Sequence, residues 1–245
     1  MTKSPVLILG ARSDIGMAVA HAYAAQGRPV QLAARNTDSL EPQKTDLELR
    51  HGVPVSLHEF DALALEDHER FAGALPELPG IAVCAVGFMG EQGESETSPA
   101  AAARVLRSNF EGPASILSVL ASRFEQRGSG TLVGISSVAG DRGRATNYVY
   151  GAAKAGFTAF LSGLRNRLAR KGVHVVTVLP GFVATQMTEG MDLPDKLTAQ
   201  PEEVARAITE ATAKQKNIVY VRPVWRLIML IIRNIPEAVF KKMSI

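Results

Sequence analysis

Short aliphatic runs alternate with longer amphipathic or alanine-rich segments along the whole chain. Seven runs are rich in β-branched and aliphatic side chains and have the length of strands: residues 6–9, 29–34, 55–60, 81–86, 131–136, 173–179 and 217–221. Helical patterns fill the six segments between them: residues 15–26, 38–50, 62–75, 99–126, 147–170 and 201–215. Because most runs are continuously apolar rather than alternating, they indicate strands buried on both faces of a parallel sheet.

This alternation predicts the fold class. We expect an α/β protein with a single doubly wound domain, about seven parallel strands and helices on both faces of the sheet. A length of 245 residues and a hydrophobic fraction of 46% suit one well-packed core. No internal repeat, low-complexity tract or linker divides the chain. Residues 1–245 are therefore expected to form one domain, with 222–245 as an apolar, basic C-terminal extension.

Composition argues against several classes of function. Cys84 is the only cysteine, which leaves no disulfide framework and no paired-cysteine zinc site, and the five histidines lack metal-binding spacing. The net charge of +3 argues against a dedicated nucleic-acid-binding protein. The apolar stretch before the first glycine is too short for a secretory signal. We expect a cytoplasmic protein without a metal site.

The first strand runs directly into the turn Gly10-Ala-Arg-Ser-Asp-Ile-Gly16 and then into a helix. Gly10 allows a tight turn, Gly16 lets helix and strand pack closely, and the helix N-terminus offers amide donors to a pyrophosphate. The same pattern occurs in plain strand-to-helix turns, so alone it is a weak signal. Its position after the first strand of a doubly wound pattern favours a Rossmann-type dinucleotide site.

The end of the second strand bears on the choice between NAD and NADP. An acid there would bind the ribose hydroxyls of NAD, whereas arginine accommodates a 2′-phosphate. Here Ala34 stands in the place of the acid and Arg35 follows it, while Arg12 can approach the same phosphate from the glycine turn. Either arginine alone could be a solvated surface charge. Their joint placement favours NADP(H) over NAD(H).

Tyr150 and Lys154 lie four residues apart and therefore share one face of a helix. Such a pair is commonplace, but the preceding strand ends in Ser136 and Ser137, at the sheet edge where ligands bind in open α/β folds. These groups fit hydride transfer to a carbonyl. The Lys154 ammonium would lower the pKa of the phenol, whose acid–base catalysis would be worth ~10²–10⁴ in rate. Ser137 would hydrogen-bond the developing oxyanion.

The glycine turn, the serine thirteen residues before "YGAAK" and the segment "PGFVAT" together resemble the short-chain dehydrogenase/reductase superfamily, over essentially the whole chain. The resemblance implies that Tyr150 donates a proton, that Lys154 binds the nicotinamide ribose and that Ser137 positions the carbonyl. It implies that Asn109 holds a water of the proton relay. Among cofactor contacts, it assigns Asp61 to the adenine amino group and residues 180–185 to the carboxamide. The full set of expected cofactor contacts is Gly10, Arg12, Ser13, Ile15, Gly16, Arg35, Asp61, Gly87, Tyr150, Lys154, Pro180, Gly181, Val183 and Thr185.

Three positions depart from the superfamily pattern. Leu9 replaces the usual Thr or Ser before the first glycine, and Asp14 replaces the middle glycine. The sequence "CAVG", ending at Gly87, replaces Asn-Asn-Ala-Gly after the fourth strand. Asp14 is a candidate cap of the first helix, but its charge would oppose a pyrophosphate if the side chain pointed inward. These changes bear on cofactor affinity and turn geometry rather than on the reaction.

The C-terminal segment is apolar and basic. It contains Trp225 and the apolar run Leu227–Ile232, and residues 214–245 carry a net charge of +6 against −3 for residues 1–213. Six apolar residues fall far short of the roughly 20 needed to span a bilayer. Two alternatives stay open: a peripheral element on the anionic inner face of a membrane, or packing against a partner subunit or the protein's own core.

The tail and the segment "SSVAGDRGRATNYVYGAAKAG" resemble one branch of the superfamily more narrowly, the decaprenylphosphoryl-2-keto-erythropentose reductases. This implies reduction of a lipid-linked ketone, a polyprenylphosphoryl-2-ketopentose, in a 2-epimerisation shared with a flavin oxidase partner. Two alternatives are a generic short-chain ketone or 3-oxoacyl reductase and a non-catalytic NADP(H)-binding sensor. Segments 99–126 and 147–170 correspond to the surfaces on which the superfamily builds homodimers and homotetramers.

Overall fold

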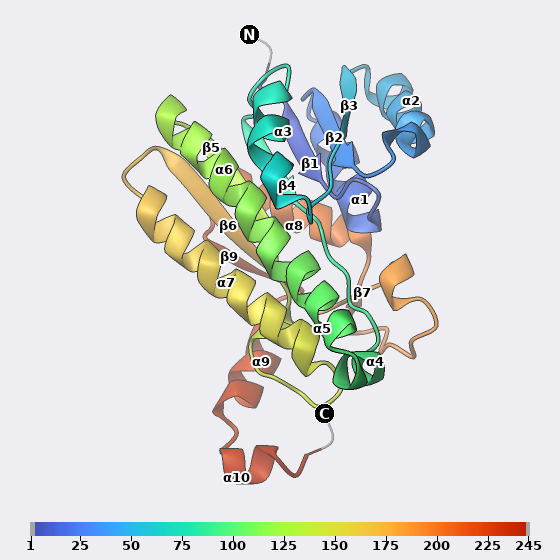
Figure 1. Ribbon diagram of the computed structural model, residues 1–245, viewed down its shortest axis with the longest axis vertical. Coiled ribbons are helices and arrows are strands. Elements are labelled where there is room, and N and C mark those ends of the chain that lie inside the picture. The colour runs from blue at the N-terminus through green and yellow to red at the C-terminus, as the bar shows by residue number, and fades with distance from the viewer. Residues whose placement is uncertain (1–2, 244–245) are drawn as a thin grey trace.

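Seven parallel strands form the centre of the structure, a computed structural model that describes residues 3–243. Their order across the sheet is β3-β2-β1-β4-β5-β6-β9. The chain therefore builds outward from β1 on one side, then crosses over to β4 on the other side of β1 (Figure 1). The strands are β1 (Val6–Leu9), β2 (Val30–Ala34), β3 (Val55–Glu59), β4 (Ile81–Cys84), β5 (Gly130–Ile135), β6 (Val173–Pro180) and β9 (Ile218–Val221).

Helices cover both faces of the sheet, which explains why most strand sequences are apolar throughout. In β1, Val6 and Ile8 belong to a core with α1 (Asp14–Ala24), α2 (Glu41–His51) and α8 (Pro201–Ala213). Leu7 and Leu9 belong to the opposite core, with α3 (His68–Ala74), α6 (Gly112–Arg127) and α7 (Tyr148–Leu168). Successive side chains of a strand point to opposite faces, so both sets must be apolar.

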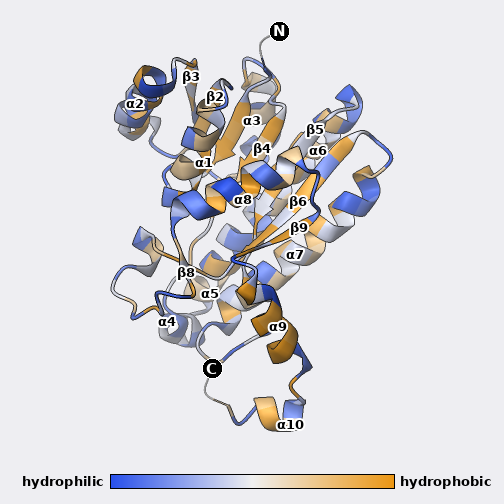
Figure 2. Ribbon diagram, turned by 180° about the vertical axis from the view of Figure 1, so that it is seen from behind, coloured by the Kyte–Doolittle hydropathy of each residue, from blue (hydrophilic) through white to orange (hydrophobic). Residues whose placement is uncertain are grey.

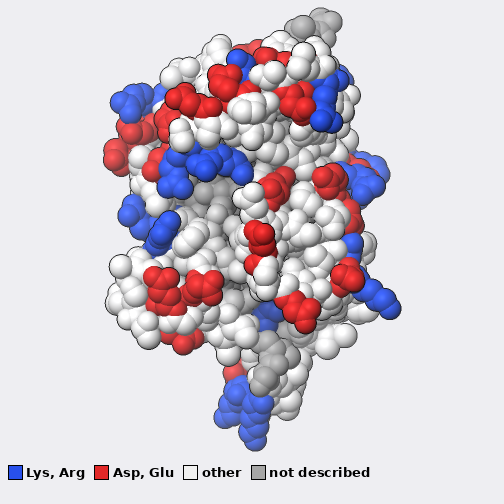
Figure 3. All heavy atoms as spheres, turned by 90° about the vertical axis from the view of Figure 1, so that its right-hand side faces the viewer, with Lys and Arg blue, Asp and Glu red and all other residues white. Residues whose placement is uncertain are grey.

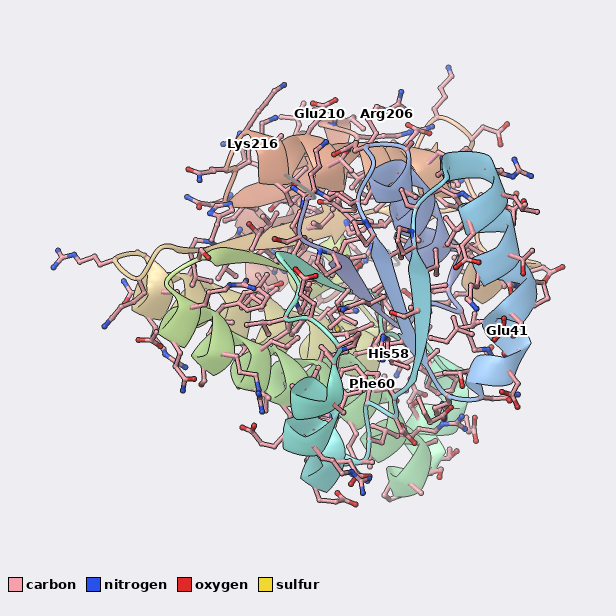
Figure 4. All side chains as sticks on the ribbon, turned by 90° about the horizontal axis from the view of Figure 1, so that it is seen from above. Glu41, His58, Phe60, Arg206, Glu210 and Lys216 are labelled. Atoms are coloured by element: carbon pink, nitrogen blue, oxygen red, sulfur yellow. The ribbon has the colours of Figure 1, made fainter. Side chains whose placement is uncertain are left out.

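The outer faces of these helices are polar. Seen from above, Arg206 and Glu210 point away from the sheet on the outer side of α8 (Figure 4).

The fold class expected from the sequence is confirmed by the seven-stranded parallel sheet, including the number of strands. Each predicted strand differs from the observed one by at most two residues at either end.

The long segment predicted as helical over residues 99–126 is built from three pieces. It consists of α5 (Pro99–Leu106), a π-helical turn at Arg107–Glu111, and α6. π-turns inside helices often occur at functional sites, and this one contains Asn109. Two predicted helices begin with 3₁₀ turns, at Thr37–Leu40 and Leu65–Asp67.

The sequence patterns did not reveal three short elements. Helix α4 (Gln92–Thr97) has the polar sequence QGESET, which shows no apolar stripe. The strands β7 (Phe182–Val183) and β8 (Thr198–Ala199) contain two residues each and form a separate parallel pair. Together α4 and the β7–β8 pair lie beyond the carboxyl ends of the central strands (Figures 1 and 2).

The C-terminal segment forms α9 (Val224–Asn234) and α10 (Glu237–Phe240), which extend below the sheet (Figure 1). One side of α9 is anchored, because Trp225 and Met229 are buried with Val138 and Leu179 in a third, smaller core. No helix within residues 3–243 is both long enough and apolar enough to cross a bilayer.

Candidate active site

Two cavities meet at the carboxyl ends of the central strands, next to the crossover between β1 and β4. The first has a volume of about 360 Å³ and is lined by Gly10, Arg12, Arg35 and Asp61, among others. The second, of about 310 Å³, is lined by Ser137, Tyr150, Lys154 and the loop after β6. Both share Ser13, Ala85, Val86 and Gly87 as walls, so they form one groove. Figure 3, which shows the right-hand side of Figure 1, shows a hollow bordered by Lys and Arg side chains.

The glycine turn is closed by its own hydrogen bonds. Gly10 has a φ of +85°, and a Cβ there would collide with the backbone of Ala85 and Val86, so only glycine fits. Ser13 caps α1: its Oγ accepts from the Gly16 amide at 3.0 Å and donates to the Gly10 carbonyl at 3.0 Å. Gly16 itself packs against this turn and lines neither cavity.

Asp14 does not cap α1, and the sequence-based expectation of an Asp14 cap is wrong. Its carboxylate accepts a hydrogen bond at 2.8 Å from the main-chain amide of Gln186, in the loop that follows β7. This contact joins the glycine turn to the loop on the other side of the groove. The carboxylate is thus satisfied by a partner 172 positions away in the chain.

The adenosine side of the groove presents two exposed arginines. Arg12 and Arg35 both line the first cavity, and within residues 3–243 neither forms an ion pair with a carboxylate. Glu59, which lies opposite Ala34 in the register of β2 and β3, accepts from the amides of Asn36 and Thr37 at 3.0 and 3.1 Å. This carboxylate is therefore committed to the turn after β2. The two arginines fit a phosphate on the adenosine ribose.

Ser137, Tyr150 and Lys154 come together on the second cavity, as the sequence predicted. Lys154 is 3% exposed and its Nζ donates to the Ile135 carbonyl at 3.0 Å. The Ser137 Oγ accepts from the Ala139 amide at 3.1 Å and lines the same cavity as Tyr150. The neighbouring Ser136 points elsewhere: its Oγ donates to the Lys154 carbonyl at 3.0 Å, which fastens α7 to β5.

The pKa of Tyr150 moves opposite to the sequence-based expectation. Burial raises the pKa of Tyr150 to about 12, and the neighbouring Ser137 hydroxyl only partly offsets this. Burial also lowers the pKa of Lys154 to about 8. The Lys154 ammonium donates to Ile135 and lies 5.7 Å from the centre of the Tyr150 ring, so desolvation of the phenolate dominates. At neutral pH, Tyr150 is therefore a neutral phenol, the form that a proton donor needs.

Asn109 is fully buried and holds the loop after β4 in place. Its Nδ2 donates to the carbonyls of Phe88 and Val105, and its Oδ1 accepts from the Phe88 amide at 3.2 Å. A Cβ on Gly87 would come within 3.3 Å of the Asn109 Oδ1 and 3.8 Å of the Lys154 Nζ. Both amide donors of Asn109 are occupied, which supports a positioning role. Its contact with a relay water remains a prediction.

The loop after β6 forms the far wall of the second cavity. A Cβ on Gly181 would overlap the indole of Trp225, which packs on the bare glycine backbone. Every predicted site residue except Gly16 and Asn109 lines one of the two cavities. In the second cavity these are joined by side chains that the sequence analysis did not single out as site residues: Met89, Arg144, Asn147, Met187, Met191 and Trp225. Most of them come from loops, whose sequences carry no periodic signal, and Trp225 comes from α9, whose sequence does not show which part of the protein it packs against.

The donor set of the groove fits a dinucleotide. The helix N-terminus at Ser13–Ile15 suits a pyrophosphate, and the first cavity suits an adenosine with an added phosphate. The second cavity brings a neutral phenol and a hydroxyl to one wall beside a buried ammonium. Within residues 3–243, no group of three or more His, Cys, Asp or Glu side chains is arranged to hold a metal ion.

Comparison with known proteins agrees with this geometry. Residues 4–195 match the family model described as short chain dehydrogenase. An uncharacterized oxidoreductase of Mycobacterium tuberculosis is 39% identical over 243 residues, which cover 98% of this chain and 97% of the relative. An uncharacterized oxidoreductase of Streptomyces coelicolor is 34% identical over 98% of this chain and 96% of the relative. Among solved structures, a short-chain dehydrogenase from Sphingobium yanoikuyae in complex with NADPH superposes with a TM-score of 0.81. The match covers 96% of this chain and 97% of that one at 24% sequence identity, so it shows a shared fold.

Proposed function

The chain belongs to the short-chain dehydrogenase family of NAD(P)-dependent oxidoreductases, and we propose that it reduces the ketone of a polyprenylphosphoryl-2-ketopentose to a secondary alcohol with NADPH. In this proposal the reaction is the second half of a 2-epimerisation, and a flavin oxidase supplies the ketone. One observation carries the reaction type: Ser137, Tyr150 and Lys154 line the same cavity, which continues into the dinucleotide groove.

Each of these side chains has a defined part in the proposed reaction. A dinucleotide held in the groove by Arg12, Arg35 and the glycine turn would supply hydride to the carbonyl carbon. Tyr150 donates its proton to the carbonyl oxygen, and Ser137 hydrogen-bonds that oxygen as negative charge develops on it. The buried Lys154 ammonium, within the same wall, favours the phenolate that remains after proton transfer. A non-catalytic sensor would not require this convergence.

The substrate assignment rests on the resemblance of the tail and of the loop before Tyr150 to the decaprenylphosphoryl-2-keto-erythropentose reductases. It is supported by the contact of the tail with the cavity, because Trp225 of α9 lines it. NADPH oxidation is to be followed with a detergent-solubilised polyprenylphosphoryl-2-ketopentose, a 3-oxoacyl thioester and simple ketones. A clear preference for the lipid-linked sugar is expected. Turnover of the thioester or the simple ketones alone would favour a generic reductase.

NADPH preference is proposed on the basis of Arg12 and Arg35. Replacing Arg35 with alanine is expected to lower the ratio of kcat/KM for NADPH over NADH by about ten- to a hundredfold, since charge-assisted hydrogen bonds to the 2′-phosphate are lost. Arg50→Ala is a matched control, because this exposed arginine on α2 pairs with Asp46. An unchanged ratio in Arg35→Ala, or a wild-type ratio near one, would refute the proposed preference.

We also propose that the tail lies on an anionic membrane surface. Leu227, Leu230 and Ile231 are about 60% exposed on α9, and Figure 2 shows the apolar character of this helix. Arg226 and Arg233 lie on the same helix, and Lys and Arg side chains gather at the tip where α10 lies (Figure 3). Apolar side chains framed by positive charge suit a surface of anionic lipids. Location at the inner face of the membrane and assembly as a homodimer or homotetramer remain predictions.

Vesicle sedimentation tests this surface. Wild-type protein is expected to bind vesicles that contain anionic lipids more strongly than neutral ones. The triple variant Leu227→Ser, Leu230→Ser, Ile231→Ser is expected to bind about tenfold more weakly or worse, because it removes the inserted apolar area. Leu49→Ser is the control, since Leu49 is 82% exposed on α2. Equal binding by the triple variant would contradict the proposal, and a change of oligomeric state instead would identify a subunit interface.

A further inference from the structure

Arg144 lines the second cavity with no partner for its charge. It lies in the loop between Ser137 and Tyr150, and it is only partly exposed. Its Nε is buried and has no hydrogen-bond partner, and no carboxylate in residues 3–243 pairs with its guanidinium. Buried polar groups are nearly always hydrogen-bonded, and unpaired charges away from water are costly. Arg144 thus has unused binding capacity on the wall of the candidate active site.

The same loop contains two other charged residues, and both are engaged. Asp141 accepts a hydrogen bond at 3.0 Å from the Tyr220 hydroxyl on β9. Arg142 donates to the carbonyls of Ile232 and Ile235 at 2.7 and 2.6 Å, which ties the loop to the end of α9. These contacts fix the loop on the side of β9 and the tail. Arg144 is the remaining charged side chain of the loop, and it lines the cavity.

Asn147, three residues further on, has a second unsatisfied atom at the same cavity. It occupies the N-cap position of α7, where an asparagine side chain usually accepts a hydrogen bond from the first turn. Here it makes no capping bond, and its Oδ1 is buried without a partner. Two polar side chains on one loop, next to Tyr150, are therefore available to a bound molecule.

The other groups of the cavity indicate what kind of molecule this is. The Asp14 carboxylate is occupied by the Gln186 amide, so the cavity has no competing free acid among its described lining residues. Val138, Met187, Met191 and Trp225 make much of the remaining wall apolar. Methionine side chains adapt to flexible apolar partners. Apart from Lys154, whose ammonium donates to the Ile135 carbonyl, the cavity combines the unpaired Arg144 guanidinium, one free acceptor and an apolar opening.

We propose that Arg144 binds a phosphate of the substrate, while Asn147 accepts a hydrogen bond from a substrate hydroxyl. The substrate class is then a hydroxylated ketone that carries a phosphate ester close to its carbonyl. This inference rests on the proposed function, because it assigns the charged part of the substrate to the same cavity. A guanidinium is suited to this task, since its fork of donors matches two phosphate oxygens.

Phosphate binding is measured first, apart from turnover. Dimethyl phosphate is titrated into NADP⁺-saturated protein, and the single tryptophan, Trp225, reports by its fluorescence because it lines the same cavity. Wild-type protein is expected to show a saturable change. Arg144→Met should weaken binding by about ten- to a hundredfold, and Arg144→Lys should weaken it less, since it keeps the charge but loses the fork. Arg170→Met is the matched control on an exposed position of the chain.

Substrate preference is measured next, with two ketones that differ only in the phosphate. These are a methyl 2-ketopentofuranoside and the corresponding methylphosphoryl sugar, both without a lipid. The wild-type protein is expected to favour the phosphorylated ketone by about ten- to a hundredfold in kcat/KM, and Arg144→Met should bring this ratio close to one. The KM for NADPH should be the same in Arg144→Met and in the wild type. This result would show that Arg144 binds the phosphate of the substrate and not a phosphate of the cofactor.

The outcomes separate the inference from the proposed function. If dimethyl phosphate causes no saturable change in wild-type protein, or binds Arg144→Met equally well, the inference is refuted even where ketones are reduced. If phosphate binds through Arg144 but no ketone is reduced, the proposed function fails and the phosphate site stands. Arg144→Met should also keep the melting temperature of the wild type, because the guanidinium has no partner in the protein to lose. A large fall would identify a structural role instead.

Discussion

Replacement of Tyr150 by phenylalanine is expected to lower kcat for ketone reduction by about 10²–10⁴-fold, while NADPH still binds. The phenylalanine ring keeps the shape of the wall next to Ser137 but has no proton to donate. Burial raises the pKa of the Tyr150 phenol to about 12, so the wild-type residue is protonated throughout the neutral range. Steady-state NADPH oxidation measures turnover, and the fluorescence of bound NADPH measures binding in the same preparation.

Tyr148→Phe provides the control for this substitution. Tyr148 is two residues away, is 45% exposed and does not line either cavity. Its hydroxyl can be removed without touching the wall that holds Ser137 and Lys154, so turnover should match that of the wild type. A Tyr150→Phe variant with wild-type turnover would remove the phenol from the reaction and favour a sensor.

Replacement of Trp225 by alanine is expected to lower the free energy of unfolding by about 3–5 kcal/mol, the range for large aromatic residues in cores. The indole is 4% exposed and packs edge-on against Phe182, with ring centres 5.4 Å apart. Its Nε1 donates to the Leu197 carbonyl at 3.1 Å, and it covers the backbone of Gly181. All of these contacts join α9 to the loop after β6. Chemical denaturation measures the loss.

Leu227→Ala, two positions further along α9, is the control for this substitution. It places an alanine in the same helix but removes no buried side chain. Leu227 is 59% exposed, so its truncation should cost well under 1 kcal/mol. If Trp225→Ala proved as mild as Leu227→Ala, the tail would not be anchored through the indole. The packing of the Trp225 indole on the loop after β6 would then contribute little to the stability of the cavity wall.

The fold could be predicted because both faces of the sheet are buried. Burial on both faces makes a strand such as Val6–Leu9 a continuous apolar run, which is distinguishable from the helices on either side. Helix α4 and the β7–β8 pair escaped prediction because their residues are few and their positions depend on neighbouring loops. The π-turn around Asn109 escaped for a different reason: a continuous helical pattern hides a local change of hydrogen bonding.

The site was predictable where a local pattern carries chemistry. The spacing of Tyr150 and Lys154 places them on one helix face, and the serines before them end a neighbouring strand, so their meeting follows from topology. Properties that depend on distant groups were predicted wrongly. The pKa of Tyr150 is set by desolvation in the wall of the cavity, and the partner of Asp14 is an amide in a loop far along the chain. Arg144 belongs to a polar loop whose sequence does not indicate where each side chain points.

The most direct test of the central claim follows the hydride itself. NADPH with deuterium at C4, prepared separately for each face of the ring, is incubated with the protein and a polyprenylphosphoryl-2-ketopentose, and the product is analysed by mass spectrometry. A reductase that acts through the Tyr150 cavity should place one deuterium on C2 of the sugar, from one of the two labelled cofactors only. An unlabelled alcohol from both labelled cofactors, or a label that stays in both cofactors while the ketone remains, would contradict the account.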